Sequence, residues 1–157
     1  MQIRSYEDTD REAVVRFALS AWAPVFASLE KTLSPALYQA WYPDWRVCQR
    51  QAVEAACAEF KAHTWVAEED GRPVGFVAVK FHPDQMGEIH MVAVDPEYQR
   101  RGIGRALTDF ALEAMKAEGA SIAMVETGGD PGHAPARRTY ECSGFELFPV
   151  ARYFKKL

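Results

Sequence analysis

The sequence predicts one mixed α/β domain of the α+β kind, with helices on both faces of a mostly antiparallel central sheet. The length of 157 residues fits a single domain spanning 1–157. Hydrophobic residues make up 48% of the chain and charged residues 25%, which is the composition of a globular protein. The expected elements alternate between helices and strands in an order that covers both sides of one sheet.

The first third is expected to be helical after a short strand at Gln2 to Ser5. Thr9 to Glu12 matches a capping box, in which a hydroxyl and a carboxylate satisfy free backbone donors, so a helix should begin there. Pro24 should kink or end that helix near Ala23. Ser34-Pro35 has the cap and the first residue typical of a second helix. A third helix is expected over about 44–60.

Strands dominate the middle of the chain. Thr64 to Glu68 and Pro73 to Phe81 flank Asp70-Gly71, which is a hairpin signal. Gly87 to Val94 should add a further strand. A helix with a regular apolar face is expected from Gly102 to Glu118.

Four shorter elements should complete the domain. They are a strand over 121–126, a loop over 128–135, a helix over 135–142, and one or two closing strands from Phe145 onward.

Composition excludes several classes of function. The net charge of −4 and the pI near 5.6 argue against binding to nucleic acid or an anionic membrane. Apolar stretches fall short of the ~20 residues of a membrane helix. The three cysteines form no CxxC pair, which indicates a cytoplasmic protein without structural zinc. The histidines lack HExxH spacing, so no metal site is expected.

The turn over 95–105 carries the clearest chemical signal. Gly102 and Gly104 stand at a helix start, where free N–H groups and the positive helix end suit a phosphate. Arg100, Arg101 and Arg105 add positive charge in an acidic chain. A P-loop is excluded because GxxxxGK is absent. A dinucleotide fingerprint, and with it a nucleotide-binding oxidoreductase, is disfavoured because Leu107 occupies its third glycine position.

Two segments together resemble the GNAT superfamily of N-acetyltransferases. Gln99-Arg100-Arg101-Gly102-Ile103-Gly104 after a strand ending in Val94 is similar to the family's cofactor signature. The stretch from Ala136 to Phe145, with Tyr140 and a final Gly-Phe, is similar to its late helix. The resemblance implies a GNAT-like fold that binds acetyl-CoA and passes the acetyl group directly to a primary amine.

The resemblance also implies how the cofactor would be held. Backbone N–H groups of the turn would hold the pyrophosphate, the end of the preceding strand would pair with the pantetheine arm, and an N–H near Val92 would face the thioester oxygen. His133 stands where many members have an asparagine that contacts CoA. The expected cofactor-binding residues are Val92, Ala93, Val94, Gln99, Arg100, Arg101, Gly102, Ile103, Gly104, Arg105 and His133.

Acetyl transfer requires an acid and a base. Tyr140 stands where the family places the proton donor for the leaving thiolate, although its ring could instead only pack beneath CoA. Glu88 lies eleven residues before Gln99, the spacing at which some members of the family carry a catalytic glutamate, so the resemblance makes it the first candidate for the base. His90 is the second, and a water chain is a further route. Strand alternation would place Glu88, His90 and Val92 on one face.

The acceptor is not identified by the sequence. Aromatic residues in the first third and near the C-terminus either pack helices together or line an acceptor pocket. A small-molecule amine and a protein amino group both fit, and a non-catalytic acyl-CoA-binding or sensing domain is the alternative. The family also makes a homodimer possible. The candidate acceptor residues are Trp22, Phe26, Tyr38, Trp41 and Tyr153.

Overall fold

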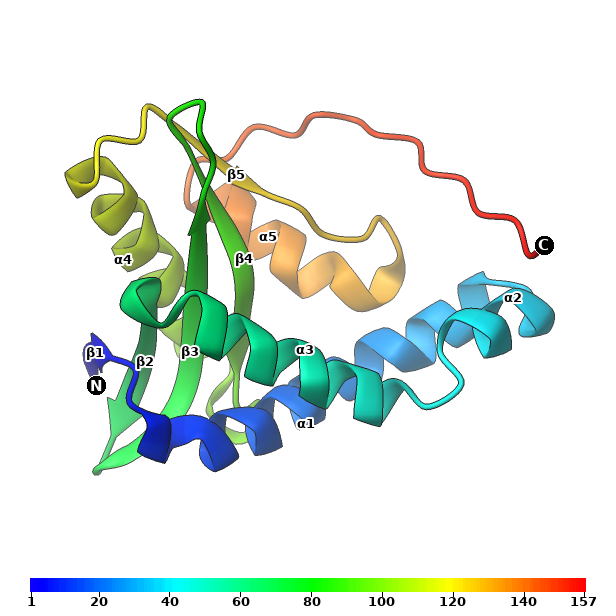
Figure 1. The fold of residues 1–157 in the computed structure, drawn as a ribbon, viewed down its shortest axis with the longest axis horizontal. Helices are drawn as coiled ribbons and strands as arrows, with labels where there is room; N and C mark the ends of the chain where they lie inside the picture. The colour runs from blue at the N-terminus through cyan, green and yellow to red at the C-terminus, as the bar shows by residue number, and fades with distance from the viewer.

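The computed structural model describes residues 1–157 and contains a five-stranded sheet in the order β1-β2-β3-β4-β5 (Figure 1). Neighbouring strands are antiparallel except β4 and β5, which are parallel. The predicted fold class is therefore confirmed. The strands are β1 (Gln2–Ser5), β2 (Thr64–Glu69), β3 (Arg72–Phe81), β4 (Met86–Val94) and β5 (Ile122–Val125).

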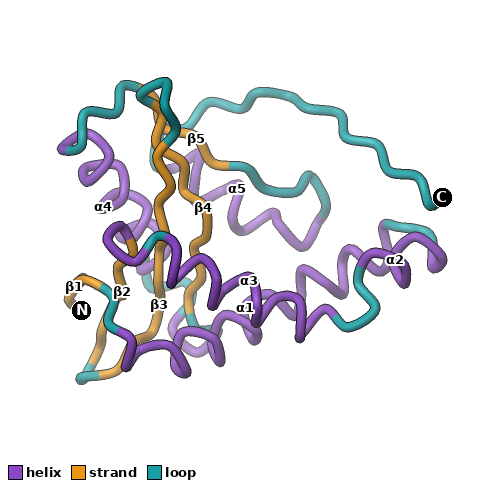
Figure 2. The backbone as a smooth tube through the Cα atoms, viewed as in Figure 1, coloured by secondary structure: helices purple, strands orange, loops and turns teal.

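Helices cover both faces of this sheet (Figure 2). One face carries α1 and α3, and α2 extends away at their far end. The other face carries α4, with α5 packed beside it. The bounds are α1 (Arg11–Thr32), α2 (Pro35–Trp41), α3 (Trp45–Glu59), α4 (Ile103–Ala117) and α5 (Ala134–Cys142).

The sheet divides the hydrophobic core in two. The first cluster lies under α1 and α3 and includes Val14, Phe17 and Phe76, all of them buried. The second lies under α4 and includes Leu107 and Met115. Alternate strand residues feed the two clusters, as the period of two requires.

Local signals set several element boundaries as predicted. The Ser34 hydroxyl accepts a hydrogen bond from the Leu37 amide at 3.3 Å, and Pro35 is the first residue of α2. Asp70 and Gly71 both have positive φ, at 50° and 72°, which is the conformation that a two-residue hairpin needs.

The predicted start of the first helix was wrong, and the helix does not end near Ala23. The Asp10 carboxylate accepts the Glu7 amide at 2.9 Å and two hydrogen bonds from Arg4 at 2.8 and 2.9 Å. This ion pair draws the chain into a short turn before α1, so Thr9 is not the cap. Pro24 lies inside α1, which continues to Thr32. Proline in a helix costs ~3 kcal/mol, and burial of Phe26 beyond it favours continuation of the helix.

The closing strands expected from Phe145 onward are absent. No regular secondary structure follows Cys142, and the tail over 143–157 runs back toward α2 (Figure 1). Leu147 and Phe148 are 79% and 82% exposed, so they pack on no sheet face. Pro149, which has no N–H to donate, further disfavours a strand there.

A β-bulge in β4 leaves Glu88 and His90 on one face, as predicted, but moves Val92 to the other. Ala78 pairs with Met91 and Val79 with Ile89, so His90 is the extra residue. Beyond the bulge Val92 packs against the cluster under α4, whereas the His90 ring contacts Phe60 at the end of α3, on the other face. Strict alternation therefore ends at the bulge.

One segment, Asp8–Thr32, is long and apolar enough to cross a membrane by length and composition alone. This corrects the expectation that every apolar stretch is too short. In the structure this segment contains α1, whose Val14, Val15, Phe17 and Ala18 are buried against the sheet. A core helix of a soluble domain passes the same test, so the finding is weak support for a membrane span.

Candidate active site

Strands β4 and β5 part midway along β4. Their pairing ends at Ile89 and Val125, and β5 then leads away toward α5 (Figure 1). The remainder of β4, from His90 to Val94, pairs only with β3. One backbone edge over Val92, Ala93 and Val94 is therefore open to an extended, amide-containing ligand.

The open edge leads directly into the glycine-containing turn. A short 3₁₀ helix (η3, Pro96–Tyr98) is capped by Asp95, whose carboxylate accepts the Glu97 amide at 3.1 Å. The Gln99 side chain donates to the Val94 carbonyl at 3.0 Å, which fixes the turn against the end of β4. Gly102 then caps α4 without a side-chain bond to the helix N–H groups, so these remain available to an anion.

The two glycines border open space. Gly102 has a φ of 82°, in the left-handed region, and a Cβ there would meet nothing within 4 Å. A Cβ on Gly104 would meet only Val94 Cγ2 at 3.7 Å, an ordinary van der Waals distance. Packing of the protein therefore does not require glycine at 104. A cradle that a Cβ would enter fits a ligand phosphate approaching the backbone.

The arginines of the turn differ in their contacts. Arg101 donates to the Glu97 carbonyl at 3.1 Å, and its guanidinium lies 4.9 Å from the centre of the Tyr98 ring. Arg105 pairs with Asp109 at 3.4 Å. Arg100 has a positive φ of 62°, and its guanidinium makes no hydrogen bond, ion pair or cation–π contact, which leaves its charge free for a ligand. Ile103 is buried in the core, so only its backbone can contribute.

Tyr140 lies in α5, on the β5 side of the fork (Figure 1). Its ring is 9% exposed and meets Phe145 edge-on, with 5.9 Å between the ring centres. Burial raises the pKa of the Tyr140 hydroxyl to about 12. At neutral pH the group is therefore protonated and able to donate.

Glu88 lies beside the last paired residues of β4 and β5. Its register partners are Lys80 on β3 and Met124 on β5. Its side chain is 18% exposed, and Oε2 lies 2.6 Å from His82 Nε2. His90 Nδ1 lies 3.7 Å from Oε1, too far for a direct hydrogen bond. The structure thus brings together both predicted base candidates and adds His82.

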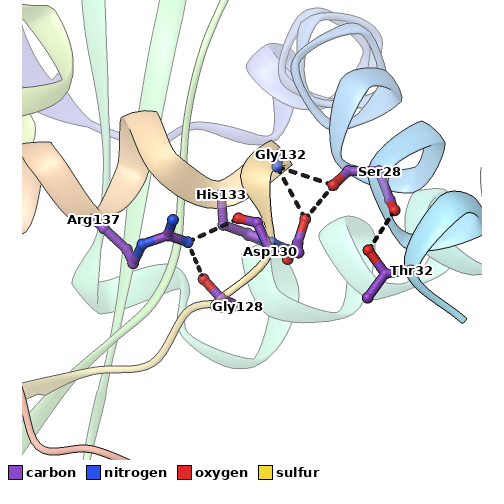
Figure 3. A network of polar contacts seen from close by, with 7 residues as sticks. All are labelled: Ser28, Thr32, Gly128, Asp130, Gly132, His133 and Arg137. Carbon is purple, nitrogen blue, oxygen red and sulfur yellow. Dashed lines mark hydrogen bonds and ion pairs between the residues drawn. The ribbon is translucent and has the colours of Figure 1, made fainter.

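His133 belongs to a polar network that joins α1 to the loop before α5 (Figure 3). The buried Asp130 carboxylate accepts from the Ser28 hydroxyl at 2.6 Å and the Gly132 amide at 3.0 Å, and it also contacts His133 Nδ1. Arg137 donates to the carbonyls of Gly128 and Asp130, at 2.5 and 2.9 Å.

This network fixes how His133 can act. Burial raises the pKa of Asp130, but hydrogen bonds from Ser28 and His133 outweigh it and hold that pKa below its usual range. The Asp130 carboxylate is therefore charged, and its contact with His133 uses the ring nitrogen Nδ1. Only Nε2 of His133 is left for a ligand. Gly132 allows the loop to lie close to α1, because a Cβ at this position would be 2.6 Å from Ser28 Cβ.

The candidate acceptor residues do not converge on one pocket. Phe26 is buried and stacks on Trp45 at 4.4 Å, and Trp22 packs against the core beneath α1. Trp41 meets Phe154 of the tail, with 4.2 Å between ring centres, and Tyr38 lies 5.7 Å from the Tyr42 ring. Tyr153 is 91% exposed. For Phe26 and Trp22 the geometry favours helix packing.

Sequence reasoning missed three polar residues that contact the predicted site residues: His82 beside Glu88, and Ser28 and Asp130 in the network of His133. His82 had a usable signal, because a hairpin after Phe81 places it diagonally across from Glu88, within reach of long side chains. Ser28 and Asp130 had none, since 102 residues separate them.

Comparison with known proteins identifies the family. The model of the acetyltransferase (GNAT) family matches residues 27–145. A mycothiol acetyltransferase of Thermomonospora curvata is 40% identical over 89 residues, which cover 57% of this chain and 29% of that protein. One from Actinosynnema mirum is 31% identical over 148 residues, or 91% of this chain and 43% of that protein. The chain thus spans less than half the length of these relatives.

Solved structures agree on the fold. The PaiA N-acetyltransferase of Thermoplasma acidophilum in complex with coenzyme A gives a TM-score of 0.71 at 18% identity, covering 96% of this chain and 92% of that one. The ribosomal-protein-S18-alanine N-acetyltransferase of Escherichia coli gives 0.68 at 21% identity, covering 94% and 79%.

Proposed function

The chain belongs to the acetyltransferase (GNAT) family, and on that basis we propose that it transfers an acetyl group from acetyl-CoA to a primary amine. The observation that carries the proposal is the unpaired edge of β4, which continues directly into the glycine turn at the start of α4. A strand edge suits the amides of the pantetheine arm, and the uncapped start of α4 suits the pyrophosphate.

Binding of the donor would be mostly a backbone function. The pantetheine arm would pair with Val92 to Val94, and the pyrophosphate would sit over Gln99 to Gly104. Arg100 would add the nearest free positive charge. The Val92 N–H would face the thioester oxygen, where negative charge develops as the amine attacks. His133 Nε2 would supply one further polar contact.

The chemistry would need Glu88 and Tyr140. An alkyl ammonium has a pKa near ~10.4, so at neutral pH the acceptor must lose a proton before its nitrogen can attack. Glu88 would take that proton at the fork, directly or through water. The C–N bond then forms, the C–S bond breaks, and the Tyr140 hydroxyl would protonate the departing thiolate. The raised pKa of Tyr140 supports a donor that stays protonated until the thiolate forms.

The acceptor is proposed to be a small-molecule amine. The relatives from Thermomonospora curvata and Actinosynnema mirum are named for mycothiol, a small molecule, which supports an acceptor of this class. A protein amino group is the other outcome to test. The three unpaired cysteines support a cytoplasmic location. Assembly as a homodimer stays a prediction.

A turnover assay distinguishes an acetyltransferase from a non-catalytic acyl-CoA sensor. We expect CoA thiol release from acetyl-CoA when the protein meets a panel of primary amines, followed by mass spectrometry of the products. Glu88→Gln should lower kcat/KM by ~100-fold or more, most strongly at low pH. Glu113→Gln, which changes an exposed carboxylate on α4, is the matched control. Tight acetyl-CoA binding without thiol release on any amine would instead favour the non-catalytic sensor.

A further inference from the structure

A single carboxylate is a weak acceptor for the proton of an alkyl ammonium. Ordinary carboxyl groups have a pKa of ~4.3 and imidazoles ~6.5, against ~10.4 for the amine. Replacing a carboxylate by an imidazole as the proton acceptor reduces the difference in pKa from the amine by about two units. The inference below rests on the proposed function and concerns how its base is built.

His82 is placed for this coupling. It follows β3 directly, and its backbone N–H donates to the Met86 carbonyl at 2.9 Å, which closes the hairpin to β4. That register brings its ring across to Glu88, with 2.6 Å between Nε2 and Oε2. The side chains are 28% and 18% exposed, so the contact is partly shielded from water while His82 keeps a path to solvent.

The other groups around Glu88 leave His82 as its principal partner. Lys80 is the register partner on β3 and Met124 the one on β5. His90, displaced by the bulge, lies 3.7 Å from Oε1, and its ring meets Phe60 of the α3 end, with 5.0 Å between ring centres. None of these groups contributes a second carboxylate, so an imidazolium beside Glu88 would be stabilised by one full negative charge.

We propose that Glu88 and His82 take up the proton of the acceptor amine as one unit, in which the His82 ring accepts the proton and the Glu88 carboxylate stabilises the imidazolium that forms. Before transfer the unit is a carboxylate and a neutral imidazole. Nε2–H of that imidazole donates to the carboxylate, so one proton leaves the ammonium, directly or through water, for the free ring nitrogen Nδ1 of His82, and the unit becomes a carboxylate paired with an imidazolium. The free amine forms the C–N bond, the thiolate leaves with a proton from Tyr140, and the imidazolium returns its proton to water.

The test is the pH dependence of kcat/KM in wild type, His82→Gln and His63→Gln. His63 is the matched control because its ring contacts Trp65 and Phe81. In wild type we expect activity to fall on the acid side at a higher pH than in His82→Gln, because an imidazole takes up a proton at higher pH than the carboxylate that remains in the variant. At pH 7 His82→Gln should lose ~10-fold or more in kcat/KM. His63→Gln should follow wild type.

A second measurement does not need activity. NMR of the ¹⁵N-labelled protein should show a slowly exchanging His82 Nε2–H that disappears in Glu88→Ala and persists in His90→Gln. An acid limb that stays in place in His82→Gln, or shifts only in His90→Gln, would overturn the proposal, as would the absence of the NMR signal in wild type. If no amine is acetylated the proposed function fails, and the NMR result still decides the pairing.

Discussion

Replacing Gly104 by alanine should stabilise the fold and weaken CoA binding at the same time. The new Cβ would meet only Val94 Cγ2 at 3.7 Å, so the substitution creates no clash within the protein. Alanine is favoured over glycine in a helix by up to ~1 kcal/mol. For a domain of this size, that corresponds to a rise in Tm of ~2–4 °C at most.

The same Cβ enters the space proposed for the pyrophosphate. A close backbone contact is then lost, and we expect the Kd for CoA to rise by ~10-fold, or ~1.4 kcal/mol. Calorimetric titration with CoA and thermal unfolding without it measure the two effects separately. Gly104→Val should enlarge the binding defect, since its side chain is bulkier.

Gly102→Ala is the variant to compare with Gly104→Ala, because it should affect both stability and binding. Its φ of 82° is strained for any residue with a Cβ, so it should lower stability by ~1–2 kcal/mol as well as weaken binding. Unchanged CoA affinity in Gly104→Ala, or a lower Tm in that variant, would refute the reasoning that glycine at 104 serves the ligand and not the fold.

Three further outcomes are expected. Tyr140→Phe should lower kcat by ~100-fold with an unchanged Kd for CoA, and since the pKa of Tyr140 is about 12, wild type should show no loss from this group below pH 10. Asp10→Asn should cost ~2 kcal/mol of unfolding free energy at pH 7, measured in urea. Burial raises the pKa of Asp10, but its bonds to Arg4 hold that pKa below the ordinary value, so the difference is present above pH ~4 and fades as pH falls through the lowered pKa. Gly132→Ala should destabilise the fold by ~1–3 kcal/mol, because its Cβ would lie 2.6 Å from Ser28 Cβ.

Features encoded within a few residues were predicted well from the sequence. The Asp70-Gly71 turn, the Ser34 cap and the glycine turn before α4 each depend on neighbours in the chain, and each is present in the structure. Such features are set by backbone conformation and by hydrogen bonds to adjacent residues, which residue types report directly.

Features that depend on contacts between distant residues were not predicted from the sequence. Pro24 predicts the end of a helix, yet α1 continues because residues before it pack against the sheet and Phe26 beyond it is buried against Trp45 of α3. The alternation of β4 reads as unbroken, yet pairing with β3 inserts a bulge at His90. The apolar residues after Phe145 read as strands, yet they find no sheet edge in the structure.

The proposed active site divides along the same line. Its proposed cofactor end is a local turn, so Gln99 to Gly104 could be predicted from the sequence alone. Its other end, which comprises Glu88 and the loop that carries His133, depends on a hairpin register that joins His82 to Glu88 and on a contact between Ser28 and Asp130 across 102 residues. Changes at the first end should therefore alter CoA affinity with the fold intact. Changes at the second should alter geometry and rate together, because the contacts that orient Glu88 and His133 also hold the hairpin and α1 in place.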